Sequence, residues 1–89
     1  MNAIVTVVGN DKVGIIANVS AFFAERSINI EDISQTVLSG NFVMMMMVDL
    51  ADSTKPLATV KDELTELGES MGVAISLMHE RVFSAMHRI

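Results

Sequence analysis

Cysteine is absent from the 89 residues, which excludes a disulfide framework, a thiolate nucleophile and a thiolate metal site. Basic residues are also few, with six Lys and Arg against eleven Asp and Glu and a formal net charge of −5. Because these six are scattered, we expect neither a nucleic-acid partner nor an anionic membrane surface. The apolar run at 3–8 is too short for a signal peptide, and no run approaches a membrane span. We therefore expect a soluble, cytoplasmic protein.

Apolar residues, in contrast, are abundant. They make up 51% of the chain, while charged residues make up only 19%. A chain of this length forms one domain and buries roughly 60–65% of the surface that its unfolded form exposes. So large an apolar fraction indicates that part of the surface is buried against another subunit, and we expect a homodimer or a higher homo-oligomer.

The patterns along the chain predict seven elements. β-Branched and alternating runs indicate strands, whereas apolar residues at three- and four-residue spacing indicate helices. The expected strands cover residues 3–8, 28–38, 42–50 and 73–78, and the expected helices cover residues 13–26, 57–71 and 79–89. We expect residues 1–79 to form the domain and residues 80–89 to form a helical extension.

Two of the expected strands have unusual patterns. In residues 28–38 the apolar positions change parity between Ile30 and Ile33, and a β-bulge near residues 31–32 would return them to one face. Residues 44–47 are all Met. Adjacent strand residues point to opposite faces, so the sulfurs are divided between the faces and do not favour a copper(I) site. The methionine run predicts instead that neither face of this strand contacts water.

The order strand, helix, strand, strand, helix, strand is that of the ferredoxin-like βαββαβ fold. It predicts an α+β domain whose four-stranded antiparallel sheet has the order 4-1-3-2, with two helices on one face. A short C-terminal helix follows. Since the strands are apolar at both parities, we expect the second face to contact the tail helix, a second subunit or both.

The loop after the first strand is the candidate functional site. The strand ends in Gly9, three polar residues follow, and a helix begins near Gly14. The first amides of a helix have no partner inside it, and the helix dipole favours an anion there. The missing Cβ of Gly14 would let a ligand approach the backbone. A simpler interpretation also exists, in which Asn10 and Asp11 are turn and cap residues.

This loop, Asn10-Asp11-Lys12-Val13-Gly14-Ile15, followed by Asn29-Ile30 at the start of the second strand, resembles the ACT domain family. The resemblance covers about residues 1–79. More narrowly, the chain is similar to stand-alone single-ACT proteins and to the ACT repeats of the glycine cleavage system transcriptional repressor. The resemblance implies a regulatory module, not an enzyme, that binds a small molecule, often an amino acid, at or near a dimer interface.

The resemblance also implies a set of ligand-binding residues, with the last two coming from the same or the partner subunit: Asn10, Asp11, Val13, Gly14, Ile15, Asn29 and Ile30. Free amides near Gly14 would bind an α-carboxylate, while Asp11 or the side-chain carbonyl of an Asn would accept from an α-ammonium group. No fused catalytic domain is expected, so the module would act through homo-oligomerisation or by contacting another protein. We expect no cofactor and no metal.

Three alternatives stay open. A structural or protein-interaction domain would have the same fold and no ligand. A small enzyme of the acylphosphatase type would need a phosphate-binding Arg in the loop, where this chain has only Lys12, with Arg26 near the end of the first helix. A metal-responsive regulator would have to use His79 or His87 in a site shared between subunits, because two His give too few ligands in one chain.

Overall fold

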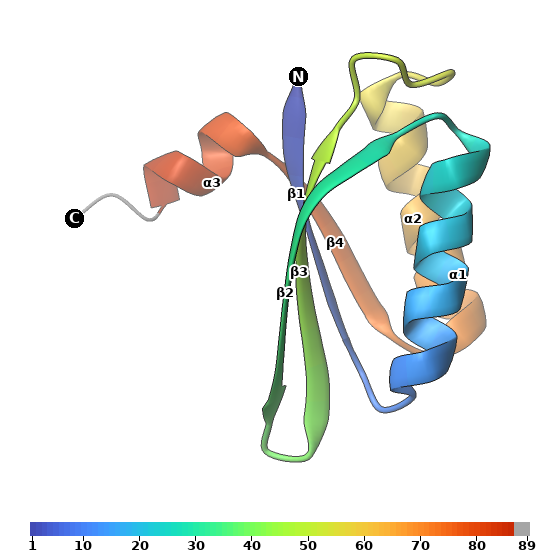
Figure 1. Ribbon diagram of the computed structural model, residues 1–89, viewed down its shortest axis with the longest axis vertical. Helices are drawn as coiled ribbons and strands as arrows, with labels where there is room; N and C mark the ends of the chain where they lie inside the picture. The colour runs from blue at the N-terminus through green and yellow to red at the C-terminus, as the bar shows by residue number, and fades with distance from the viewer. Residues whose placement is uncertain (87–89) are drawn as a thin grey trace.

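The computed structural model describes residues 1–86, with Lys12 and Met86 described by their backbone alone. The elements are, in order, β1 (Asn2–Gly9), α1 (Lys12–Glu25), β2 (Asn29–Leu38), β3 (Asn41–Asp49), α2 (Leu57–Met71), β4 (Ala74–His79) and α3 (Glu80–Met86) (Figure 1). Every boundary lies within one residue of the expected one, apart from the end of the tail helix. His87 and Ile89, which the expected tail helix includes, lie outside the described residues.

The two long helices end where the local backbone leaves the helical region. Gly72 follows α2 in the left-handed region, with φ of +70°, and its N–H donates to the Glu69 carbonyl. After α1, Ser27 adopts a positive φ of +56° and the chain turns into β2. Both stops agree with the expected helix ends. Over residues 1–86, no helix combines the length and the apolar character needed to cross a membrane.

The sheet has the order β2-β3-β1-β4, and each pair of neighbours is antiparallel. This is the expected order 4-1-3-2 counted from the other edge. Both α1 and α2 lie on one face, and α3 lies on the opposite side of the sheet (Figure 1). The predicted ferredoxin-like α+β fold is therefore confirmed.

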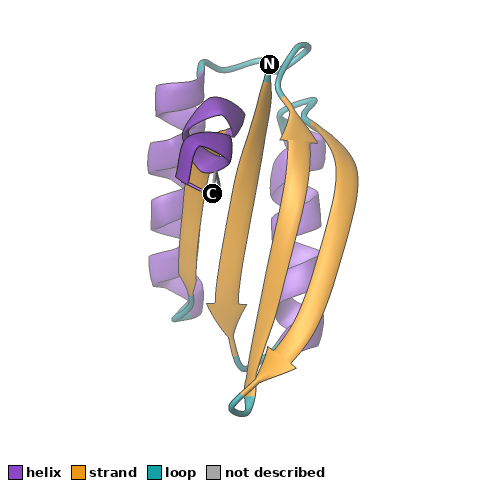
Figure 2. Cartoon of the chain, turned by 90° about the vertical axis from the view of Figure 1, so that its left-hand side faces the viewer, coloured by secondary structure: helices purple, strands orange, loops and turns teal. Residues whose placement is uncertain are grey.

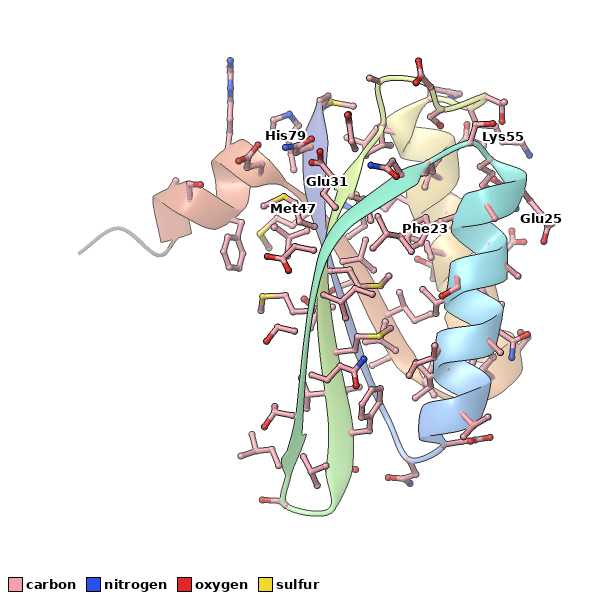
Figure 3. The ribbon with its side chains drawn as sticks, viewed as in Figure 1. Phe23, Glu25, Glu31, Met47, Lys55 and His79 are labelled. Carbon is pink, nitrogen blue, oxygen red and sulfur yellow. The ribbon has the colours of Figure 1, made fainter. Side chains whose placement is uncertain are left out.

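The core lies between the sheet and the two long helices. The inward residues of the central strands are fully buried, among them Val5 and Val7 of β1 and Met44 and Met46 of β3. Phe23 of α1 is also completely buried, and its side chain points from the helix towards the sheet (Figure 3). Every second residue of β1 and β3 thus faces the helices, as the strand period requires.

The predicted β-bulge in β2 is present. Ile30 pairs with Val48 and Asp32 pairs with Met47, so Glu31 is an extra residue opposite the regular strand β3. Because of this extra residue, Ile30 and Ile33 lie on the helix-facing side, although they differ in parity. Asp32 and Ser34 lie on the other side, in register with Met47 and Met45.

The second face of the sheet is only partly covered. α3 packs against β1 and β4 at one end of this face and leaves most of β2 and β3 uncovered (Figure 2). Met45 is 37% exposed there and Met47 is half-buried. The prediction that neither face of the methionine strand contacts water is therefore wrong for the single chain, because a helix of seven residues is too short to cover four strands.

Candidate functional site

The loop between β1 and α1 is closed by a helix cap. Asp11 is the N-cap residue of α1, and its Oδ1 accepts a hydrogen bond from the Gly14 N–H at 3.0 Å. The Asp11 carbonyl accepts from the Ile15 N–H, also at 3.0 Å. Next along the helix, the Asn18 side-chain amide donates to the Gly14 carbonyl at 2.8 Å. The interpretation of Asp11 as a cap residue is thus confirmed.

This cap changes the expected chemistry of Gly14. The sequence predicted a free Gly14 amide for a ligand carboxylate, but that amide is already bound to the Asp11 carboxylate. A Cβ on Gly14 would lie 2.7 Å from Asp11 Oδ2, so the missing side chain gives room to the cap. Any ligand anion at this helix end must therefore use the amides of residues 12 and 13 or displace the Asp11 carboxylate.

The other loop residues differ widely in exposure. Asn10 is exposed, and Val13 at the start of α1 is 79% exposed. Ile15 is completely buried in the core between helices and sheet. Asn10 and Val13 can therefore contact a ligand on the surface, whereas Ile15 only fixes the start of the helix against the sheet.

The structure does not bring Asn29 and Ile30 to this loop within one chain. Asn29 pairs with Asp49, which pairs with Asn2, so Asn29 lies beside the beginning of β1. The loop follows Gly9, at the far end of the same strand. Seven residues of strand at about 3.3 Å each separate the two ends by roughly 23 Å. One ligand of amino-acid size cannot contact both sets of residues in a single chain.

Between these two ends lies an exposed apolar edge. Ile33 and Val37 face the helix side, in register with Met46 and Phe42, but they are 43% and 70% exposed. Leu38, at the end of the strand, is 65% exposed. We call Ile33, Val37 and Leu38 the β2 flank. Because β2 is an edge strand, the flank borders a row of backbone groups that no neighbouring strand pairs within residues 1–86.

A polar groove of about 430 Å³ lies between α1 and α2, on the side away from the sheet. At its edge, the Arg26 guanidinium lies 3.6 Å from the centre of the Phe22 ring and donates to Glu63 Oε1 at 3.0 Å. Lys55 Nζ donates to the second Glu63 oxygen at 2.7 Å. The hydrogen bond from Arg26, and then that from Lys55, hold the pKa of Glu63 below its ordinary value.

Arg26 and His79 are among the residues that the enzyme and metal alternatives would use, and the structure describes the contacts of both. The Arg26 guanidinium also donates to the Phe22 carbonyl of its own helix at 2.9 Å. With the bond to Glu63 of α2, its hydrogen bonds lie at the C-terminal end of α1, away from the loop that precedes this helix. Over residues 1–86, no three side chains of His, Asp or Glu come close enough together to hold a metal ion. His79 lies at the end of β4, where its Nδ1 accepts from the Arg81 N–H.

A second cavity, of about 190 Å³, lies on the open face of the sheet, and nothing in the sequence patterns indicated it. Its lining comes from β1, β2, β3 and α3, and consists of Ile4, Asp32, Ser34, Met45, Met47 and Phe83. The tail helix α3 lies on the second face of the sheet, as expected, and its position over β1 and β4 creates this cavity. No local sequence pattern specifies where on that face the helix lies.

Comparison with known proteins gives a consistent family assignment. The sequence model of the ACT domain family matches residues 2–78. A UPF0237 protein of Listeria innocua is 49% identical over 89 residues, which is all of both chains. The solved structure of an ACT domain protein from Streptococcus pneumoniae has a TM-score of 0.82 at 42% identity, covering 93% of each chain. A putative glycine cleavage system transcriptional repressor has a TM-score of 0.75 at 26% identity, covering 85% of this chain and 44% of that one. The chain therefore belongs to the ACT domain family.

Proposed function

We propose that this protein is a regulatory module that binds a small molecule, an amino acid, in a site shared between two copies of the chain. Family membership supports the regulatory role. The observation that supports the shared site is the separation of the two groups of expected ligand residues, which stand at opposite ends of one sheet. A ligand that uses both groups needs the loop of one chain and the Asn29 end of another.

A two-fold symmetric contact along the β2 flank would satisfy this requirement. In such a contact the two β2 strands run antiparallel, so the beginning of one strand meets the end of the other. Val37, near the end of β2, lies in register with Gly9 through Phe42, at the level of the loop. The loop of one copy would then lie level with Asn29 of the other. The exposed Ile33, Val37 and Leu38 supply apolar surface for this contact.

The polar groups at the two ends suit the two charges of an amino acid. The amides of residues 12 and 13 lie in the first turn of α1, where the helix offers them no carbonyl, and they would receive the α-carboxylate. The side-chain oxygens of Asn10 and of Asn29 from the second copy would accept from the α-ammonium group. Ligand binding would thereby stabilise the dimer, because only the paired state contains the complete site.

The first test is a thermal-unfolding screen with the twenty common amino acids at millimolar concentration. A ligand at a hundredfold excess over its Kd stabilises the folded state by about 2.7 kcal/mol. We expect at least one amino acid to raise the unfolding temperature, and Asn10→Ala and Asn29→Ala each to abolish that rise. Asn41→Ala changes an exposed Asn at the hairpin and serves as the matched control. No rise with any amino acid would contradict the proposal.

A mixing experiment tests whether the site is shared. In a mixture of Asn10→Ala and Asn29→Ala chains, each mixed dimer has one intact site, formed by the unchanged loop of one chain and the unchanged Asn29 of the other. Random exchange should therefore restore about a quarter of the wild-type binding capacity. A site contained in one chain would give no recovery at all.

The association itself can be tested at the β2 flank. Val37→Lys places a charge in the proposed contact and should shift the protein to a monomer in sedimentation, with loss of the amino-acid effect. Val82→Lys, at a half-exposed Val of α3 away from the flank, is the control. If Val37→Lys still sediments as a dimer, the contact between the two copies does not include the β2 flank.

A second candidate function, a protein-interaction domain without a ligand, is favoured by one observation. The Asp11 carboxylate already satisfies the Gly14 amide, so the loop is stable with nothing bound. This function predicts that no amino acid raises the unfolding temperature. It also predicts that the association between copies of the chain is the same with and without amino acids.

A further inference from the structure

The cavity under α3 combines an apolar floor with a polar edge. Ile4 and Met47 pair across β1 and β3, and Met47 pairs in turn with Asp32 of β2, so these three side chains form one row across the open face. Met45 and Ser34 belong to a neighbouring row on the same face. Phe83 of α3 completes the lining. The cavity is therefore apolar over the central strands and at α3, and polar only along the edge strand.

The side chains at the polar edge of the cavity can accept hydrogen bonds. Asp32 Oδ1 accepts from the Ile33 N–H at 2.9 Å, and Oδ2 makes no hydrogen bond or ion pair with any of residues 1–86. Ser34 adds a hydroxyl that can accept or donate. Glu31 is next to Asp32 in the bulge, and the whole chain has a net charge of −5. An anion would be repelled from this edge, whereas a cation would be attracted to it.

The remaining lining suits the apolar body of such a cation. Thioethers are polarisable and adapt their shape to a partner, and they make favourable contacts with aromatic rings. An aromatic ring also attracts a cation placed over its face. In Figure 3, Met47 extends from the sheet on the same side as α3. The cavity volume of about 190 Å³ is below the range of about 300–1,000 Å³ that is typical of pockets for drug-sized ligands, so the site suits a smaller molecule.

We propose that the cavity under α3 is a second binding site, separate from the loop, and that it takes a small organic amine with a compact apolar body. The ammonium group donates to Asp32 Oδ2 and to the Ser34 hydroxyl. The apolar body lies on Ile4, Met45 and Met47, against Phe83. The proposal does not depend on the amino-acid site, since neither Asn10 nor Asn29 lines this cavity.

Binding at this position would be reported by α3. Seven residues make a helix that is marginal in water by itself, and α3 is held by its contacts with β1 and β4. A ligand between Phe83 and the sheet adds contacts that exist only when α3 is docked. The bound amine should therefore slow the hydrogen exchange of the α3 amides, which links occupancy of the site to the order of the C-terminal helix.

The methionine run supplies an internal control for the test. In the full-length protein labelled with ¹³C at the Met methyl groups, Met45 and Met47 report on the open face, whereas Met44 and Met46 report on the core. Benzylamine, benzyl alcohol and benzoate have nearly the same shape and differ in charge, so we use these three as probes. We expect benzylamine to shift the signals of Met45 and Met47 and to leave those of Met44 and Met46 nearly unchanged.

Two variants separate charge recognition from general apolar binding. Asp32→Asn keeps the oxygen that accepts from the Ile33 amide and removes the charge, and it should weaken benzylamine binding about tenfold without changing that of benzyl alcohol. Asp52→Asn, at an exposed Asp in the loop before α2, is the matched control and should change neither. Equal binding of benzylamine and benzyl alcohol to the wild-type protein would overturn the proposal.

Two further outcomes would also overturn it. If the Met45 and Met47 signals move with protein concentration and not with benzylamine, the open face is a contact between copies of the chain. If benzoate binds as tightly as benzylamine, Asp32 does not select the charge of the ligand.

Discussion

The Asp11 carboxylate and the Gly14 amide are bound to each other at 3.0 Å, and the carboxylate can lie there because Gly14 has no Cβ. The two residues that most suggested a ligand site in the sequence thus form a helix cap with each other. A cap at this position is compatible with the proposed amino-acid site. In that site a ligand carboxylate would meet a negative side chain at the helix end, and the amides of residues 12 and 13 would have to hold it.

The cap itself should be measurable as stability. Asp11→Ala removes the acceptor for the Gly14 amide and should lower the free energy of unfolding by about 1 kcal/mol. Asp11→Asn keeps an acceptor oxygen and should cost less than Asp11→Ala. Urea denaturation measures both, with Asp52→Ala as the control at an exposed Asp. An Asp11→Ala loss no larger than that of the control would show that the cap adds nothing in solution.

Met46 and Met45 are adjacent in β3 and lie on opposite faces of the sheet, where they are 1% and 37% exposed. Met46→Ala leaves a cavity in the core and should lower the free energy of unfolding by about 2–5 kcal/mol. Met45→Ala, on the open face, should cost at most about 1 kcal/mol. Guanidinium denaturation at low protein concentration gives both values. Equal losses would indicate that Met45 is buried in solution by something other than its own chain.

Glu63 should give a pH-dependent contribution to stability. The Arg26 hydrogen bond, and secondly that of Lys55, lower its folded-state pKa from the ordinary value of 4.5. A lowered pKa stabilises the folded state at pH values above 4.5, and the contribution is lost as the pH falls through the folded-state pKa. The difference in unfolding free energy between wild type and Glu63→Gln should thus be largest near neutral pH. It should vanish at pH values below the folded-state pKa of Glu63.

A series of urea midpoints from pH 3 to pH 7 would measure this difference. Glu66→Gln is the matched control, because Glu66 lies on the same helix without an ion pair among the described residues. A difference between wild type and Glu63→Gln that is independent of pH would contradict the assigned pKa direction.

Most of the fold was predictable because each element has a strong local pattern. The β-branched run of β1 and the regular apolar spacing of α2 each allow one structure, and Gly72 marks a helix end through its positive φ. The bulge could also be predicted from the sequence, because Ile30 and Ile33 differ in parity. They can share one face of the sheet only if the strand contains an extra residue between them.

The position of Asn29 relative to the loop could also have been found from the sequence. A helix of 14 residues rises about 1.5 Å per residue, so α1 carries the chain roughly 21 Å back to the beginning of β1 before β2 starts. Residues grouped by a family motif are not necessarily neighbours in one chain. The cavity under α3, in contrast, depends on how a short helix docks onto the sheet, and no periodicity in the sequence determines that.

The bulge in β2 makes the strand tolerant of change at Glu31, both in side-chain identity and in chain length. Glu31 is exposed, and its replacement by another polar residue would change little. Deleting it would join Ile30 directly to Asp32 and give a regular strand, in which Asp32 and Ser34 still face the open side and Ile33 and Val37 still face the helices. A single deletion at the bulge would therefore remove the irregularity and keep the acidic cavity and the apolar flank on their own faces of the sheet.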